Sequence, residues 1–200
     1  MRITTHTQVS VDGVMQGNGG RDGDLDPGFE RGGWALPLFD AKSIAYVDEV
    51  YQRADAFLFG RRTFELFARY WGTMAPGAAP VADALNARPK YLASNTITHP
   101  GWADTTVLSG DLATAIRELK AGPDGELQVH GSGALIRWLL ENNLVDEISL
   151  LVLPVIVGDG TRLFPATGPD QALELVESRA FPTGIALQTY RPTGRPTYAN

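Results

Sequence analysis

The sequence predicts an α/β domain built on a mostly parallel sheet, with helices on both faces and an antiparallel hairpin at its C-terminal end. Segments with the period of a strand alternate with segments with the period of a helix up to residue 146, which is typical of a parallel sheet. Beyond that residue only strand patterns remain. The last two alternate around Pro182-Thr183-Gly184 and indicate the hairpin. With no internal repeat and no boundary, residues 1–200 are expected to form one domain.

The expected strands are alternating or apolar runs that end at turn residues. The first is rich in β-branched residues, and the sixth is the longest apolar run of the chain. In chain order, strands are expected at residues 1–10, 54–59, 90–93, 105–108, 126–130, 148–157, 172–181 and 185–191.

Four helices are expected between these strands. Asp40 and Asp111 can cap two of them, Gly60 ends a strand where the Arg61 helix opens, and Ser132 starts the fourth. Their apolar stripes should face the core. In the three helices with a clear stripe, these residues are Ile44, Val47, Val50 and Tyr51, then Leu112, Ala115, Ile116 and Leu119, and then Leu135, Ile136, Leu139 and Leu140.

A long loop is expected after the first strand. Residues 13–37 contain eight glycines and two prolines, too many for a regular element. Long loops in compact domains are usually functional, so this loop is expected to lie beside a site.

Composition excludes several classes of protein. The chain has no cysteine, which removes disulfide scaffolds, thiolate zinc sites, iron–sulfur clusters and cysteine nucleophiles. It carries 17 Lys and Arg against 23 Asp and Glu, a net charge of −6 that disfavours binding to nucleic acid. Residues 56–95 nevertheless hold five bases against two acids. One phosphate-rich cofactor can therefore bind at a locally basic position.

Targeting signals are not evident in the sequence. The N-terminal residues include no apolar stretch of the kind that marks a signal peptide, so a cytoplasmic location is expected. The apolar run at residues 148–157 is interrupted by Ser149 and Pro154 and is about half the length of a membrane helix. No membrane association is expected.

The segment Gly60-Arg61-Arg62-Thr63-Phe64 is a candidate phosphate site. It combines free N–H groups at a helix start with two guanidinium groups and a hydroxyl, and Arg binds phosphate oxygens in a bidentate manner. The alternative is a strand-terminating glycine followed by two solvated arginines. Its position at a strand end favours the functional interpretation.

The segment His130-Gly131-Ser132-Gly133-Ala134-Leu135 repeats this arrangement after a later strand. Glycines let a pyrophosphate approach the backbone, and Ser132 can either donate to it or cap the helix. Ile136 stands at the third glycine position, so the usual dinucleotide fingerprint is incomplete. A tight strand-to-helix turn is the alternative.

Other polar and aromatic residues leave two readings open. Asp12 follows the first strand, where its carboxylate can contact a substrate or form a common Asp-Gly turn. Trp34, in the long loop, suits local packing or ring stacking. The three histidines, His6, His99 and His130, have no metal-ligand spacing and are expected to be satisfied polar or surface residues, with no metal site.

Taken together and in order, these motifs resemble the dihydrofolate-reductase-like superfamily, which implies its three-layer fold. The sequence is most similar to stand-alone proteins that resemble the C-terminal reductase domain of the bifunctional riboflavin-biosynthesis deaminase-reductase. The resemblance covers nearly the whole chain. It is carried by Ser10-x-Asp12-Gly13, Gly60-Arg61-x-Thr63-Phe64, Ser94, His130-Gly131-Ser132-Gly133-x-Leu135, Asp146-Glu147 and Pro154-Val-Ile-x-Gly158-x-Gly160-x-x-Leu163-Phe164.

This resemblance implies an NADPH-dependent reductase that acts on a small heterocycle, either 5-amino-6-ribosylaminouracil-like or pterin-like. It implies contacts of Arg61, Thr63 and Ser94 with the adenosine 2′-phosphate, and of residues 131–135 with the pyrophosphate. Two arginines, Arg61 and Arg62, would favour NADPH over NADH through charge-assisted bonds. Asp12 becomes the leading catalytic acid and would stabilise an iminium. A homodimer is also implied.

Two departures from the resemblance limit its implications. We expect no deaminase within residues 1–200, because without cysteine its zinc site cannot form there. Asp40 follows Trp34 one residue later than the acid of the folate enzymes, so Asp40 is either a substrate ligand or a helix cap. The alternative function is a non-catalytic nucleotide-binding or regulatory protein, because beyond Asp12 no second catalytic residue is evident.

Overall fold

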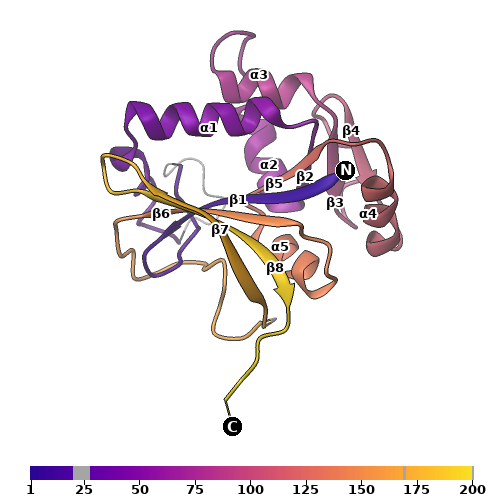
Figure 1. Cartoon of the computed structure of the whole chain (residues 1–200). Coiled ribbons are helices and arrows are strands. Elements are labelled where there is room, and N and C mark those ends of the chain that lie inside the picture. The colour runs from indigo at the N-terminus through magenta and orange to yellow at the C-terminus, as the bar shows by residue number, and fades with distance from the viewer. Residues whose placement is uncertain (20–27, 169, 200) are drawn as a thin grey trace.

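The computed structural model describes residues 1–19, 28–168 and 170–199, and within these it has one eight-stranded sheet (Figure 1). The strand order is β4-β3-β2-β5-β1-β6-β8-β7. Strands β1 to β6 pair in parallel, and the last two join as an antiparallel hairpin. The strands are β1 (Arg2–Ser10), β2 (Ala56–Gly60), β3 (Lys90–Ala93), β4 (Thr105–Leu108), β5 (Glu126–His130), β6 (Glu147–Leu153), β7 (Ala172–Ala180) and β8 (Ala186–Gly194).

Helices cover both faces of the sheet, so the predicted α/β fold with three layers is confirmed. Strand β2 shows the division, because Phe57 and Phe59 face one layer of helices and Leu58 faces the other. Helices α1, α2 and α3 pack on the phenylalanine face, and α4 and α5 pack on the opposite face (Figure 1). The helices are α1 (Ala41–Arg53), α2 (Arg61–Tyr70), α3 (Pro80–Ala87), α4 (Leu112–Ala121) and α5 (Gly133–Glu141).

The structure corrects three expectations about the elements. Strand β6 ends at Leu153 rather than at residue 157, because Pro154 has no N–H to continue the ladder. Helix α3 was not predicted, although Pro80 opens it and Asp83 lies in its first turn, as is usual for helix starts. In α1 the side chain of Ile44 is 50% exposed, whereas that of Ser43 is buried. The buried face of α1 is therefore rotated away from Ile44.

The first residues of the long loop dock on the segment that follows β6. Val14 forms an isolated antiparallel bridge with Arg162, and the N–H of Met15 donates to the carbonyl of Thr161. Residues 20–27 of this loop lie outside the described residues. Further on, Leu36–Leu38 form a short 3-10 helix before α1. The loop thus connects the end of β1 to the segment after β6.

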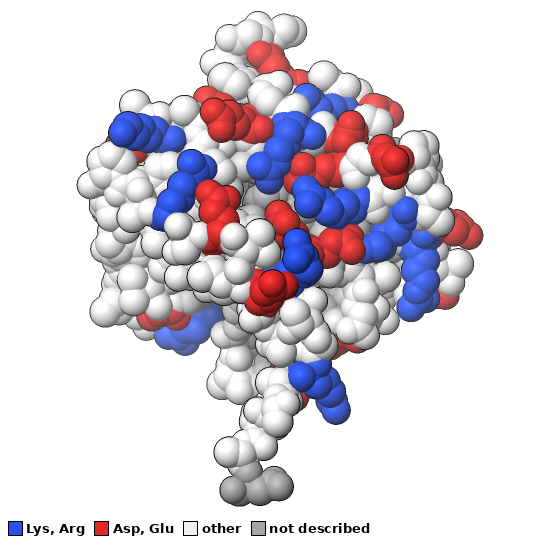
Figure 2. Space-filling view, viewed as in Figure 1, with Lys and Arg blue, Asp and Glu red and all other residues white. Residues whose placement is uncertain are grey.

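The charged side chains are mixed in sign over the surface seen in Figure 2. Ion pairs on strands account for part of this mixture, among them Arg2 with Glu147 at 3.5 Å and Arg191 with Glu174 at 3.5 Å. Such exposed pairs contribute little to stability. This surface offers no large area of one sign. In the described part of the chain, no helix is both long and apolar enough to cross a membrane.

Candidate nucleotide-binding site

The predicted site residues from four neighbouring strands lie at one edge of the sheet. Parallel strands β3, β2, β5 and β1 are adjacent in that order, and their carboxyl ends carry Ser94, Gly60, Gly131 and Asp12 respectively. Three strand spacings, about 14 Å across the sheet, separate β3 from β1. Along the strands Asp12 lies further on than Gly131, because His6 is the residue of β1 that pairs with His130. This span suits an extended dinucleotide better than a single phosphate.

The sheet topology at this edge has the connection pattern that favours a ligand crevice. The chain leaves β2 into α2 on one face of the sheet and leaves the adjacent β5 into α5 on the other face. Neighbouring strands whose helices diverge in this way form the crevice in which open α/β sheets bind ligands. The starts of α2 and α5 therefore flank the crevice.

Both helices that begin here lack a side-chain cap. The residue before α2 is Gly60, and Ser132 before α5 makes no capping bond. By contrast, Asp40 and Asp111 cap α1 and α4 through their carboxylates. Helix α3 is also uncapped, but it begins with a proline, whose missing N–H needs no partner. The first-turn N–H groups of α2 and α5 are thus suited to an anion.

Two hydrogen bonds join the starts of α2 and α5. The N–H of Gly60 donates to Ser132 Oγ at 3.0 Å, and the N–H of Ser132 donates to Thr63 Oγ1 at 2.9 Å. In both bonds the hydroxyl oxygen is the acceptor. The hydroxyl protons of Thr63 and Ser132 therefore remain available for donation to a ligand oxygen.

The turn between β5 and α5 has a left-handed backbone at two consecutive residues. Gly131 has φ +56° and Ser132 has φ +53°. A Cβ on Gly131 would lie 3.3 Å from Thr63, closer than an ordinary contact. Ser132 is the costly residue of the pair, because a side chain in this region is strained. Below, residues 131–132 are called the phosphate turn.

These features meet the requirements of a dinucleotide cofactor such as NADPH. Glycine at position 131 leaves the backbone open to close approach, and two hydroxyl protons and two helix starts face the same crevice. Arg61 is exposed and its guanidinium lies 3.9 Å from Glu65, a long contact that a phosphate can replace. Ser94 lies at the end of β3, where its Oγ accepts from the N–H of Ile97. Arg62 is exposed on the first turn of α2.

The other residues predicted on this segment differ in what they can contribute. Leu135, in the first turn of α5, has its side chain buried in the core, so only its backbone can reach a ligand. Gly133 is buried, and a Cβ there would lie 2.6 Å from the sulfur of Met15. Ala134 is exposed. Sequence reasoning missed Met15, which lies against the start of α5 although it belongs to the long loop.

Asp12 ties the end of β1 to the segment after β6. One carboxylate oxygen accepts from Ser10 Oγ at 2.7 Å and from the N–H of Val157 at 3.0 Å. The other accepts from the N–H of Gly158 at 2.9 Å and lies 3.5 Å from the guanidinium of Arg162. These hydrogen bonds, that from Ser10 first, hold the pKa of Asp12 far below its usual range. The carboxylate is ionised at neutral pH and donates no proton.

Trp34 and Asp40 make structural contacts. The indole N–H of Trp34 donates to the carbonyl of Gln16 at 2.8 Å, which closes the long loop on itself. Asp40 accepts from the N–H of Ser43 at 2.8 Å and forms a capping box with it, and this bond lowers the pKa of Asp40. The N–H of Thr183 also donates to Asp40 at 3.3 Å. Of the two readings of Asp40, the structure supports the helix cap.

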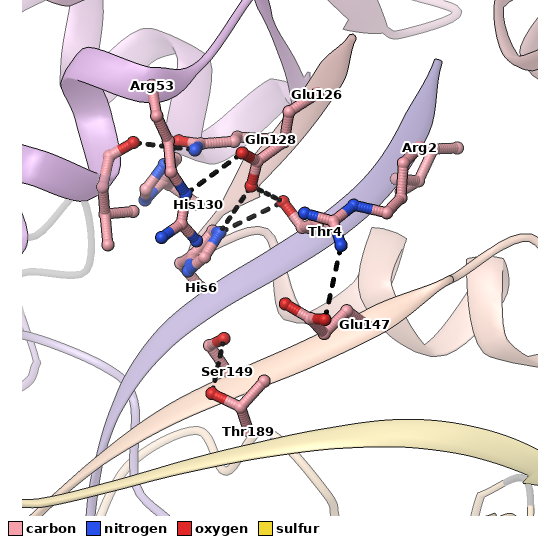
Figure 3. Close-up of polar contacts among 12 residues, drawn as sticks. Arg2, Thr4, His6, Arg53, Glu126, Gln128, His130, Glu147, Ser149 and Thr189 are labelled. Atoms are coloured by element: carbon pink, nitrogen blue, oxygen red, sulfur yellow. Dashed lines mark hydrogen bonds and ion pairs between the residues drawn. The ribbon is translucent and has the colours of Figure 1, made fainter. Parts of the chain in front are cut away.

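A buried polar cluster lies beside the site, between α1 and the sheet (Figure 3). We call it the imidazole cluster. Its rings stack, with Tyr51 and His130 3.9 Å apart between centroids and His130 and His6 5.2 Å apart. Polar residues at every second position of β1 and β5 were the sequence signal for it, although the histidines alone did not indicate their proximity. The cluster consists of Thr4, His6, Tyr51, Glu126, Gln128 and His130.

Hydrogen-bond directions fix the protons of both histidines. Gln128 donates its amide N–H to the carbonyl of Val50 at 2.7 Å, so its oxygen accepts from Nε2 of His130 at 2.8 Å. The hydroxyl of Thr4 donates to Glu126 at 2.7 Å and is left to accept from Nε2 of His6 at 3.1 Å. Nε2 of each ring therefore carries a proton.

Burial determines the charge states in this cluster. It lowers the pKa of His6, and it lowers that of His130 well below the ordinary value. Burial also opposes ionisation of Glu126, but hydrogen bonds from His6 and Thr4 and the charge of Arg53 outweigh it and lower that pKa to about 2. Among the described residues, no group of three histidines or carboxylates is arranged to hold a metal ion.

The fold defines an α/β protein in which the uncapped starts of two helices, α2 and α5, meet at one edge of the sheet. Residues 2–187 match the family model described as the RibD C-terminal domain. The chain belongs to this family.

Relatives and solved structures extend the comparison. Two proteins of Bacillus subtilis strain 168, both described as uncharacterized, match nearly the whole chain: YyaP is 24% identical over 199 residues, and YwjB is 22% identical over 190 residues. The alignments cover 96% and 95% of this chain, and 96% and 98% of the relatives.

Two crystal structures share the fold. One, from Shewanella sp. PV-4, is described provisionally as a riboflavin biosynthesis protein; its TM-score is 0.68 at 22% identity, and the match covers 96% of this chain and 99% of that one. The other, a pyrimidine reductase-like protein of Corynebacterium diphtheriae, has a TM-score of 0.64 at 14% identity, with coverage of 96% and 92%.

Proposed function

We propose that this protein is an NADPH-dependent reductase that transfers a hydride to a small heterocyclic substrate. The observation that carries the proposal is the pair of uncapped helix starts, α2 and α5, joined by the bonds between Gly60, Thr63 and Ser132. Membership of the RibD C-terminal domain family supports it. Bound NADPH would supply the hydride, while the protein supplies binding, orientation and charge.

Individual residues take distinct roles in this proposal. The first-turn N–H groups of α2 and the phosphate turn hold the pyrophosphate, and Arg61 and Arg62 with Ser94 hold the 2′-phosphate. Because Asp12 is ionised and fully hydrogen-bonded, its role is to supply negative charge beside the reacting group and to fix the segment at Val157. A cationic centre such as an iminium on the substrate would be stabilised by that charge.

The substrate class follows from the family and not from a cavity. We infer a ring related to 5-amino-6-ribosylaminouracil or to a pterin. Trp34 closes the long loop and Asp40 caps α1. A contact of either residue with the substrate is therefore only a proposal. We place the reaction in the cytoplasm, which subcellular fractionation can check.

Titration of the protein with NADPH and with NADH tests the cofactor assignment. We expect enhanced fluorescence of the reduced nicotinamide on binding and tighter binding of NADPH. Absence of binding, or a clear preference for NADH, would contradict the proposal. The alternative, a non-catalytic nucleotide-binding protein, predicts binding without reaction. Single-turnover oxidation of bound NADPH by a ribosylaminouracil or pterin would exclude that alternative.

A homodimer is the assembly that we infer for the reductase. It rests on the family resemblance, and three apolar side chains of β7 are open to a second copy: Leu173, Leu175 and Val176 are 40%, 54% and 46% exposed. Light scattering over a concentration series measures the assembly directly. Leu175→Glu should weaken the dimer, whereas its neighbour Glu174→Gln should not. A monomeric wild-type protein would exclude this assembly.

A further inference from the structure

The imidazole cluster connects the end of α1 to the phosphate turn. The N–H of Ala54 donates to the carbonyl of Tyr51 and not to that of Val50, the acceptor that a continued α-helix would use. The carbonyl of Val50 is therefore left to accept from another group. Gln128 of β5 donates to the carbonyl of Val50 and accepts from His130. His130 directly precedes the phosphate turn. One continuous path of bonds therefore runs from the last turn of α1 to residues 131–132.

The same path continues across the crevice into α2. Beyond His130, the N–H of Ser132 donates to Thr63, and Ser132 Oγ accepts from the N–H of Gly60. The start of α2 is thus fixed to the phosphate turn, and the turn is fixed to α1 through His130. Figure 3 shows His130 beside Gln128, with His6 below it.

The left-handed backbone of Ser132 has to be held from both sides. A residue with a side chain in this region costs free energy, and the conformation persists only where the surroundings impose it. On the C-terminal side, Thr63 and Gly60 provide the restraint. On the N-terminal side, the restraint is the ring of His130, stacked between Tyr51 and His6 and bonded to Gln128.

We propose that His130 is a positioning residue that holds the phosphate turn in its nucleotide-binding geometry. The identity of the ligand, NADPH, rests on the proposed function. The contacts by which His130 holds the turn do not depend on it. His130 touches no ligand in this proposal. It acts through the backbone of Gly131 and Ser132, so its loss should weaken the binding of NADPH more than it changes the rate of hydride transfer.

The decisive variant is His130→Phe, which keeps a planar ring against Tyr51 but has no ring nitrogen, so the hydrogen bond from Nε2 to Gln128 is lost. Ser149→Ala is the matched control. Ser149 lies on the same face of the sheet, is equally buried and bonds to Thr189 at 3.2 Å, but it has no bond to β5. Both variants leave one buried polar atom without a partner, so both should lower the melting temperature.

Two measurements separate positioning from stability. By fluorescence titration, we expect the Kd for NADPH to rise roughly fivefold in His130→Phe, the factor that corresponds to one lost hydrogen bond. In the control it should stay unchanged. Hydrogen exchange gives the second readout, because the Gly60 N–H bonded to Ser132 should exchange faster in His130→Phe and not in the control.

These outcomes test the positioning role of His130 and the proposed function separately. Unchanged NADPH affinity in His130→Phe, or an equal loss in Ser149→Ala, would overturn the positioning role. If the wild-type protein binds no NADPH, the proposed function fails. Exchange at Gly60 then still decides whether His130 holds the turn: faster exchange confined to His130→Phe supports it, and exchange that is the same in both variants refutes it.

Discussion

The imidazole rings of His6 and His130 stack with their centroids 5.2 Å apart and their planes 23° apart, and both rings are uncharged. The two residues come from adjacent strands and pair directly in the register of β1 and β5. The rings are neutral because burial lowers the pKa of both, and each Nε2 donates to an oxygen, that of Thr4 or that of Gln128. Two consequences concern pH and stability.

Stability should fall as the pH is lowered through the range in which histidine titrates. Burial lowers the folded-state pKa of His6 and His130, so below about pH 6.5 the unfolded chain binds protons that the folded chain does not. The free energy of unfolding is therefore complete above pH 6.5 and decreases below it. Urea unfolding at pH 7.5 and pH 5.5 should differ by roughly 2 kcal/mol for two such groups.

Variants of individual histidines show which residue causes the pH dependence of stability. His130→Phe should lose about half of the pH dependence, because one of the two buried rings no longer titrates. His99→Gln serves as the control, since His99 is exposed in a loop. Equal pH dependence in the wild type and in His130→Phe would argue against a neutral His130. Working above pH 5 keeps Glu126 out of the measurement, because its contribution to stability is lost only as the pH falls below the unfolded-state pKa of about 4.3 toward the folded-state value of about 2.

Replacing Thr5 or Thr7 of β1 by valine is predicted to increase the free energy of unfolding. The hydroxyls of Thr5 and Thr7 are buried and have no hydrogen-bond partner among the residues that the structure describes. Replacement of either residue by valine removes a desolvated polar atom and keeps the shape of the side chain, so unfolding should become about 1 kcal/mol more costly. Thr4→Val on the same strand should instead lower the free energy of unfolding, because the hydroxyl of Thr4 donates a hydrogen bond to Glu126. A loss of stability in Thr5→Val would refute this reasoning.

Asp12→Asn is expected to separate catalysis from cofactor binding. The carboxylate accepts one backbone N–H on each oxygen, whereas the amide can accept on only one of these two sides and carries no negative charge. Turnover should be lost while NADPH affinity is kept, because Asp12 lies beyond the end of β1 and binds the segment at Val157 rather than the phosphate turn. Steady-state kinetics and titration measure the two quantities. Unchanged turnover would remove Asp12 from the catalytic residues.

The two arginines at the start of α2 are expected to determine the preference for NADPH. In the double variant Arg61→Ala and Arg62→Ala, NADPH affinity should fall at least tenfold, about 1.4 kcal/mol, toward that of NADH. NADH affinity should change little, because it has no 2′-phosphate. Arg69→Ala, later in the same helix, is the control. Retention of the full preference by the double variant would place the 2′-phosphate elsewhere.

The strands and most helix starts could be predicted from the sequence because their signals are local. Gly60 and Asp111 mark helix starts by residue type alone, and Pro182-Thr183-Gly184 marks the hairpin. The end of β6 was misjudged because the apolar run continues past Pro154, whereas the ladder cannot. Helix α3 was missed because its eight residues give too few turns for a clear period.

The candidate site was predictable only in part. The positions at strand ends indicated that Gly60 and Gly131 would lie at one edge, and the sheet order brings them together. The bond of Ser132 to Gly60 depends on a left-handed backbone that no sequence period reveals. The clamp of Asp12 on Val157 and Gly158 joins segments far apart in the chain, so its role as a fully bonded carboxylate emerged only from the fold.

The placement of β1 also determines how this chain has to be made. Arg2–Ser10 leaves the ribosome before both of its neighbours in the sheet, Glu126–His130 and Glu147–Leu153. This central strand therefore has no partner strand until residues 126–130 have been synthesised. Such non-local pairing slows folding. During that interval a strand with two free edges is exposed, and its protection falls to the nascent helices or to chaperones.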